Sequence, residues 1–186
     1  MSTPGSVIVV GGGPAGMVCG LLLARAGVRV TVLEKHDDFF RDFRGDTVHP
    51  STLTLLDELG LGPAFDQVPY SKLERVRVPV RGGGDVVVSD LTRLRLARPY
   101  IAMTPQWDFL NFITDEAKRY PGFHLLMNAE VTDLVVEDGV VRGVHYRTAD
   151  GEHTALAQLT VGVDGRTAIP RGRAGDAAVA RSAGPA

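Results

Sequence analysis

A glycine-rich segment followed by an acidic residue carries the clearest chemistry in the sequence. The segment Gly11–Gly16 directly follows the apolar run 7–10, and seventeen residues separate Gly16 from Glu34. Glycines at this spacing allow a tight turn, let a phosphate approach the backbone and let a helix pack closely on a strand. A carboxylate further along can accept the hydroxyls of a ribose. The pattern therefore predicts a site for a nucleotide.

The elements that must position these residues form a βαβ unit. We predict a buried strand over 7–10, a helix from Pro14 to Ala26 that ends at Gly27, and a second strand over 28–33 that ends on Glu34. The helix N-terminus, where Pro14 and Ala15 lie, offers unpaired N–H groups and the positive end of the helix dipole to an anion. Within the segment, Gly11 allows the turn, Gly13 leaves room for a pyrophosphate and Gly16 permits close helix packing.

The order of these elements separates a nucleotide site from a structural turn. A glycine-rich turn alone is common, but here strand, glycines, helix, second strand and acid follow one another as a dinucleotide site requires. Glu34 would repel a 2′-phosphate, so NADP is disfavoured as the ligand of this unit.

Composition narrows the classes of protein and partner. The chain has 186 residues, of which 44% are apolar and 23% charged, as expected for a globular protein with one core or one core plus a small insertion. The net charge of −2 and the scattered basic residues favour neither nucleic acid nor an anionic membrane as a partner. The N-terminal residues lack a positively charged region and a long apolar run, so we expect no signal peptide or membrane span and a cytoplasmic protein. The single cysteine, Cys19, is interpreted as a helix-packing residue.

The rest of the chain alternates helices with strands and contains one insertion. An inserted antiparallel sheet is predicted from a hairpin around the turn Gly82–Gly84, with 94–97 as a further strand. A later helix is predicted from a Thr104 cap to Tyr120. The remaining predictions are a loop over 35–49, a helix over 50–59, a strand over 123–127, a three-stranded meander over 129–137, 140–146 and 153–159, and a last strand over 159–163.

Several motifs together resemble a known family. They are the Gly11–Gly16 segment with Glu34, the Arg44-Gly45-Asp46 run, Gln106 at the start of the later helix, and the run 162–166 around Asp164-Gly165. With these motifs the chain resembles the N-terminal half of the FAD-dependent aromatic hydroxylases, the group A flavoprotein monooxygenases of the para-hydroxybenzoate hydroxylase type. The resemblance implies an α/β, Rossmann-like FAD-binding fold with a three-stranded β-meander and the small inserted antiparallel sheet.

The resemblance also implies roles for individual residues. Glu34 would hold the adenosine ribose, Arg44 and Gln106 would lie along the pyrophosphate and ribityl chain, and Asp164 would close over the pyrophosphate. On their own, Arg44 reads equally as a solvated loop cation and Asp164 as a turn residue. The full set of cofactor contacts that we predict is Gly11, Gly13, Pro14, Ala15, Gly16, Glu34, Lys35, Arg44, Gln106, Val131, Asp164 and Gly165.

The activity implied is hydroxylation of an aromatic or similar electron-rich small molecule, with FAD as cofactor and NAD(P)H as transient reductant. The flavin supplies the difficult chemistry in such enzymes, so no catalytic acid or base is predicted. The five histidines show neither metal-ligand nor triad spacing. Open alternatives are an FAD-dependent reductase or dehydrogenase of the same fold, a non-catalytic FAD-binding fragment, and an NAD-binding Rossmann domain.

The resemblance also suggests a division of the chain. We expect an FAD-binding domain over 1–72, the inserted sheet as the start of a substrate domain over 73–100, a continuation of the FAD-binding domain over 101–170 and a disordered tail over 171–186. The run Thr167–Pro170 departs from the family pattern. Because the family continues well beyond this point, we expect a truncated form of a longer hydroxylase.

Overall fold

The computed structural model describes residues 5–40 and 46–165, which group into two compact units. Described residues before Phe39 and from Ile113 onward form the first unit, and Phe39–Phe112 form the second. The boundaries of these units, at 38/39 and 112/113, differ from the functional boundaries expected above, at 72/73 and 100/101. The units are defined by compactness and not by contacts with cofactor or substrate, so the functional division of the chain stays a prediction.

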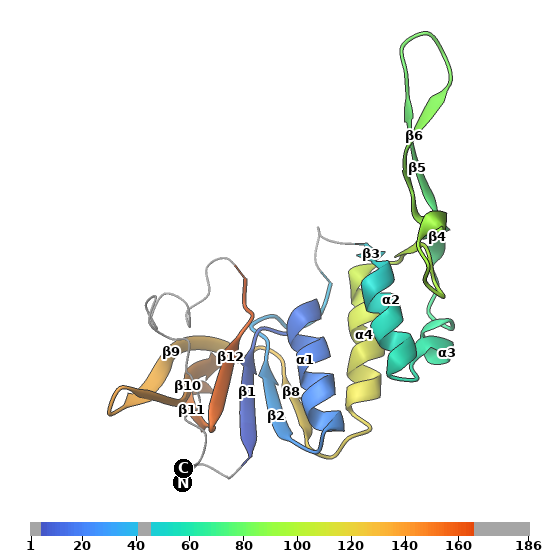
Figure 1. Cartoon of the computed structure of the whole chain (residues 1–186). Coiled ribbons are helices and arrows are strands. Elements are labelled where there is room, and N and C mark those ends of the chain that lie inside the picture. The colour runs from blue at the N-terminus through green and yellow to red at the C-terminus, as the bar shows by residue number, and fades with distance from the viewer. Residues whose placement is uncertain (1–4, 41–45, 166–186) are drawn as a thin grey trace. The chain divides into compact units, whose positions relative to one another are not determined.

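The first unit is built on a four-stranded parallel sheet with the order β12-β1-β2-β8. The strands are β1 (Ser6–Val10), β2 (Arg29–Leu33), β8 (Phe123–Leu126) and β12 (Leu159–Gly162). Helix α1 (Pro14–Arg25) covers one face of this sheet (Figure 1). The βαβ unit predicted from the sequence is therefore present, with parallel β1 and β2 joined through α1.

Helix α1 buries one stripe of its surface against the sheet. Met17, Leu21 and Ala24 are buried, as the 3.6-residue period predicts. Leu22 is 38% exposed, because it follows Leu21 by one position and so lies on another face of the helix. Gly27 follows the helix with φ +80°, a left-handed conformation that favours glycine.

A three-stranded antiparallel meander packs beside the parallel sheet (Figure 1). Its strands are β9 (Glu130–Glu137), β10 (Val140–Thr148) and β11 (Gly151–Leu156). Asp138 and Gly139 both have positive φ, as a tight hairpin turn requires. The core between sheet and meander contains Ile8, Val10, Leu33, Ala129, Val131, Leu134, Val144 and Ala157.

The second unit combines short strands with helices. A three-stranded sheet has the order β3-β7-β4, and a separate hairpin pairs β5 with β6. The strand bounds are β3 Thr47–Val48, β4 Ser71–Leu73, β5 Arg75–Pro79, β6 Asp85–Asp90 and β7 Ile101–Met103. The helices are α2 (Pro50–Glu58), α3 (Gly62–Phe65) and the start of α4 (Gln106–Ala117), whose last residues belong to the first unit.

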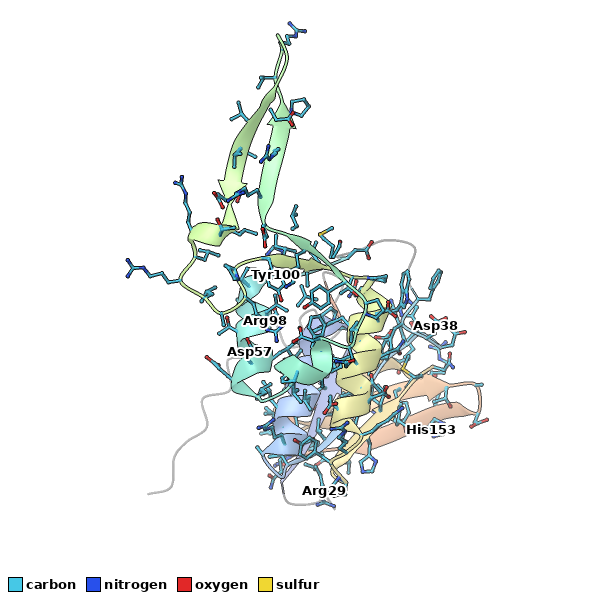
Figure 2. All side chains as sticks on the ribbon, turned by 90° about the vertical axis from the view of Figure 1, so that its right-hand side faces the viewer. Arg29, Asp38, Asp57, Arg98, Tyr100 and His153 are labelled. Atoms are coloured by element: carbon cyan, nitrogen blue, oxygen red, sulfur yellow. The ribbon has the colours of Figure 1, made fainter. Side chains whose placement is uncertain are left out.

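The hairpin β5–β6 extends away from the other elements of this unit (Figure 2). Its valines are largely solvent-exposed, with Val86 at 50% and Val88 at 59%. Figure 2 shows Asp57, Arg98 and Tyr100 close together near the base of this hairpin.

Three expectations for this region were wrong. Residues 94–97 do not form a strand, because the chain passes through a single 3-10 turn (Leu91–Arg93) and then runs irregularly to β7. Thr104 does not cap α4, since its hydroxyl donates to the Pro69 carbonyl at 2.9 Å and the helix begins two residues later. Helix α4 ends at Ala117 rather than at Tyr120.

The α/β fold with its parallel sheet, meander and inserted hairpin is confirmed. Among the described residues, no helix combines the length and apolarity needed to cross a membrane.

Candidate dinucleotide site

Two sequence motifs far apart in the chain meet at the carboxyl ends of neighbouring strands. Gly11 follows β1 and Asp164 follows β12, and β1 and β12 pair directly. Gly11 has φ +108°, and its N–H donates to the Leu33 carbonyl at 2.8 Å. A Cβ at Gly11 would lie only 2.8 Å from the Asp164 Cα. The glycine is thus required both by the backbone conformation and by the close approach of the second motif.

The other glycines of the segment serve different steric needs. A Cβ at Gly12 would lie 2.8 Å from the Glu34 Cβ, and one at Gly16 would lie 1.9 Å from the Gly11 carbonyl oxygen. A Cβ at Gly13 would meet nothing within 4 Å. Gly12 and Gly16 are therefore needed for packing, whereas a side chain at Gly13 would point into open space.

The N-terminus of α1 is suited to an anion. Gly13 is the N-cap and provides no side chain to accept a hydrogen bond from the first turn. Pro14 occupies the first turn, and Pro14 and Ala15 are exposed. The helix dipole and the N–H groups of this turn together favour a negatively charged ligand without a basic side chain.

Glu34 lies beside this loop and accepts hydrogen bonds from Gly12 and His36. It is 7% exposed, and its Oε2 accepts a hydrogen bond from the Gly12 N–H at 2.8 Å. Its Oε1 accepts from the His36 N–H at 3.1 Å and contacts the His36 ring at Nδ1. Burial alone raises the pKa of a carboxyl, but the hydrogen bonds from the His36 ring and from the Gly12 and His36 N–H groups hold the pKa of Glu34 below its ordinary value. Glu34 is thus an ionised acceptor at the tip of β2.

The other predicted contacts fall into three groups. Lys35 is exposed, and Gly165 follows Asp164 with φ +94°. The Val131 side chain is 6% exposed and packs in the core, so a contact from this residue would come from its backbone. Gln106 is the first residue of α4 and belongs to the second unit, and Arg44 lies outside the described residues.

Sequence reasoning missed two residues of the site. Gly12 was read only as part of the motif, although its N–H is the donor to Glu34. His36 was not singled out, although its backbone and ring both contact the acid. Its position two residues after the acid was the available signal, because one turn of chain at a strand end can direct an N–H back to the preceding carboxylate.

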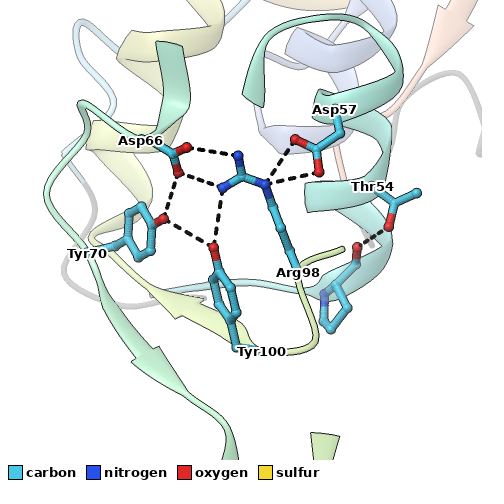
Figure 3. A network of polar contacts seen from close by, with 7 residues as sticks. Thr54, Asp57, Asp66, Tyr70, Arg98 and Tyr100 are labelled. Carbon is cyan, nitrogen blue, oxygen red and sulfur yellow. Dashed lines mark hydrogen bonds and ion pairs between the residues drawn. The ribbon is translucent and has the colours of Figure 1, made fainter. Parts of the chain in front are cut away.

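A second cluster of charged residues lies in the second unit (Figure 3). The Arg98 Nε donates to both Asp57 carboxylate oxygens at 2.9 and 3.0 Å, and the Nη2 donates to Asp66 at 2.9 Å. The Tyr70 hydroxyl donates to Asp66 at 2.8 Å and contacts the Tyr100 hydroxyl at 3.2 Å. The hydrogen bond from Arg98 is the main cause that lowers the pKa of Asp66 to about 2.

The family model described as an FAD binding domain matches residues 5–182. The chain belongs to this family. 6-Methylpretetramide 4-monooxygenase of Streptomyces rimosus is 34% identical over 169 residues, which cover 91% of this chain and 40% of that relative. Para-nitrophenol 4-monooxygenase of Pseudomonas sp. (strain WBC-3) is 25% identical over 179 residues, covering 94% of this chain and 43% of that relative.

Solved structures agree with this assignment. OxyS anhydrotetracycline hydroxylase from Streptomyces rimosus matches with a TM-score of 0.76 and 27% identity, over 90% of this chain and 33% of that one. The p-nitrophenol 4-monooxygenase PnpA from Pseudomonas putida DLL-E4 matches with a TM-score of 0.73 and 26% identity, over 86% of this chain and 40% of that one. The chain spans less than half the length of each of these relatives. The predicted resemblance to FAD-dependent aromatic monooxygenases is thereby confirmed.

The residues at the glycine loop fit the adenosine diphosphate part of FAD. The open space at Gly13 offers room for a phosphate, and the uncapped N-terminus of α1 offers N–H donors for its charge. The buried, ionised Glu34 offers an acceptor for ribose hydroxyls. Within residues 5–40 and 46–165, no cluster of three or more histidine, cysteine, aspartate or glutamate side chains is arranged to hold a metal ion.

Proposed function

We propose that this chain supplies the FAD site of an NAD(P)H-dependent monooxygenase that hydroxylates an aromatic or similar electron-rich small molecule. The observation that carries the proposal is the meeting of Gly11, Glu34 and Asp164 around one loop at the carboxyl edge of the parallel sheet. Relatives that match the chain are named as monooxygenases of 6-methylpretetramide and of para-nitrophenol. The reaction is assigned to this chain by family membership, because a fold alone does not determine a reaction.

The proposal gives each part of the loop a task in holding the cofactor. The first turn of α1 binds the pyrophosphate through its N–H groups, and Gly13 leaves the space that this group occupies. Glu34 accepts hydrogen bonds from the adenosine ribose, and Asp164 with Gly165 closes the site from the end of β12. Lys35, Arg44, Gln106 and Val131 complete the proposed contacts.

The bound flavin would supply the redox chemistry, with electrons from a nicotinamide coenzyme and oxygen as the oxidant. The protein holds the cofactor in one orientation and excludes water from part of it. Glu34 disfavours a 2′-phosphate at the adenosine site, which FAD would occupy, so NADH and NADPH would both react from elsewhere. We place the protein in the cytoplasm, where both coenzymes are available.

The test is reduction of the bound flavin. The full chain is loaded with FAD and mixed with NADH or NADPH without oxygen, and the loss of flavin absorbance is followed. Oxygen uptake and hydroxylated product are then measured after readmission of air with a panel of phenols. Coenzyme-dependent reduction followed by phenol-dependent product formation would support the proposal, and Glu34→Ala should lose both together with the flavin.

Other outcomes favour the competing functions. Reduction with no hydroxylated product would indicate a reductase or dehydrogenase of the same fold. Flavin that binds but is reduced by neither coenzyme would contradict the monooxygenase assignment and favour a chain that only binds FAD.

A further inference from the structure

His36 contacts the acid of the dinucleotide site from two positions. Its backbone N–H donates to Glu34 Oε1 at 3.1 Å, and its ring Nδ1 contacts the same oxygen. An ionised carboxylate only accepts hydrogen bonds, so the ring must carry its proton on Nδ1. The histidine side chain is 43% exposed, whereas the glutamate side chain is 10% exposed. The ring therefore lies between the buried acid and solvent.

The backbone around this pair is fixed by the neighbouring elements. The Glu34 N–H donates to the Leu126 carbonyl at 2.9 Å, and the Glu34 carbonyl accepts from Ala129 at 2.8 Å. The His36 carbonyl accepts from the Asn128 N–H at 2.9 Å. These hydrogen bonds hold 34–36 against the segment that joins β8 to β9. The backbone donors to the carboxylate are thus set by the fold, and the His36 ring is a side-chain donor that a substitution can remove.

We propose that His36 is a positioning residue of the adenosine subsite, which fixes the Glu34 carboxylate so that it meets the ribose hydroxyls of an adenine dinucleotide. The inference rests on the proposed FAD site and adds to it a residue outside the glycine motif. A carboxylate held by the Gly12 N–H on one oxygen and by His36 on the other has lost the freedom to rotate about its last bond. Its acceptor positions are then preorganised, so less conformational freedom is lost when the ribose binds.

The inference makes a ligand-dependent prediction. His36 should matter for ligands that contain adenosine and not for those that lack it. FAD and ADP contain the ribose that Glu34 would hold, whereas FMN does not. We expect His36→Ala to raise the Kd for FAD and for ADP up to about tenfold, because binding must then also order the Glu34 side chain, and to leave the Kd for FMN unchanged.

The experiment is calorimetric titration of the full chain with each of the three ligands. His36→Asn is the matched control, because the asparagine amide can place an N–H near the position of Nδ1 and should restore most of the FAD affinity. A second comparison uses the Glu34→Gln background. If His36 acts through the acid, His36→Ala should have no further effect on FAD binding once Glu34 is Gln. Thermal unfolding of each variant shows whether the fold is kept.

Each result decides the inference. An adenosine-specific loss that His36→Asn restores and that vanishes with Glu34→Gln would support it. Wild-type affinity in His36→Ala, an equal loss for FMN, or a loss that persists with Glu34→Gln would overturn it while the FAD site stands. A wild-type chain that binds neither FAD nor ADP would overturn the proposed function and this inference together.

Discussion

The two carboxylate clusters of the molecule differ in what surrounds their oxygens. In the second unit, Asp57 and Asp66 are both bound by the Arg98 guanidinium, and the tyrosine hydroxyls complete the network (Figure 3). In the first unit, Glu34 is held by backbone N–H groups and a histidine, next to an uncapped helix N-terminus and the open space at Gly13.

This difference distinguishes a cluster whose charges are satisfied within the protein from the proposed dinucleotide site. A guanidinium between two carboxylates satisfies their charges within the protein. There is also little free space beside Asp57, because a Cβ at Gly62 would lie 2.0 Å from the Asp57 Oδ1. The Glu34 region instead combines a carboxylate with the N–H groups of a helix N-terminus, which we propose to bind ribose hydroxyls and phosphate respectively. We therefore expect substitutions around Glu34 to alter ligand binding and substitutions around Arg98 to alter stability alone.

Gly16→Ala should have the largest effect, because the new Cβ would lie 1.9 Å from the Gly11 carbonyl oxygen. Helix α1 would have to move away from the loop, which we expect to cost about 3 kcal/mol or more of the free energy of unfolding. Urea unfolding followed by circular dichroism measures this loss. Gly13→Ala is the matched control and should change unfolding by less than about 0.5 kcal/mol, since its Cβ meets nothing within 4 Å. Equal stability of the two variants would contradict the steric account of the loop.

Arg98→Met should lower stability without weakening FAD binding. The Arg98 side chain is 14% exposed, and its loss removes the guanidinium that binds both carboxylates. Because Asp57 and Asp66 are partly exposed and water can solvate them, we expect a loss of about 2 kcal/mol, less than for a fully buried pair. Urea unfolding and FAD titration of the same preparation test both halves of this expectation. A large loss of FAD affinity in folded Arg98→Met would contradict the view that the Arg98 cluster affects stability alone.

Tyr70→Phe should have a smaller effect of the same kind. The substitution removes the hydroxyl that donates to Asp66 at 2.8 Å and contacts Tyr100, while the ring can still stack against Phe65, at 5.4 Å between centroids. The expected loss is about 1 kcal/mol, the net value of one hydrogen bond. Combining Tyr70→Phe with Arg98→Met should cost less than the sum of the two, because both act on Asp66. Strict additivity in urea unfolding would argue against a connected network.

The response to acid should be the smallest effect. Hydrogen bonding to Arg98 lowers the pKa of Asp66 from 3.8 to about 2. Its stabilising contribution is therefore present above pH 3.8 and is lost as the pH falls toward 2. Arg98→Met removes this cause, so part of its destabilisation should disappear at low pH, and its unfolding free energy should converge on that of the wild type. Circular dichroism of urea unfolding between pH 2 and 6 follows this. A gap that widens on acidification would contradict it.

The first unit follows closely from the sequence because its signals are local. Val7–Val10, the glycines and Gly27 each specify a strand, a turn or a helix end within a few residues, and the Asp138-Gly139 turn does the same for the meander. The approach of Gly11 to Asp164 came from family resemblance, since nothing local brings residues over 150 positions apart together. The sheet β3-β7-β4 was missed because strands of two or three residues carry no period.

The second cluster was also beyond sequence reasoning. Arg98 meets Asp57 and Asp66 across 41 and 32 positions, and an arginine among many scattered basic residues gives no sign of its partners. His36 could have been noticed from its closeness to Glu34, but its ring contact depends on how the end of β2 is held against 126–129.

The central claim is that the glycine loop with Glu34 binds FAD, and a direct binding titration tests it. The full wild-type chain, Glu34→Ala and Arg98→Met are titrated with FAD in a calorimeter, and unfolding controls show that each is folded. We predict saturable binding to the wild type and to Arg98→Met, with the Kd raised at least tenfold in Glu34→Ala. Undetectable binding to the folded wild type, or an affinity unchanged by Glu34→Ala, would contradict the account.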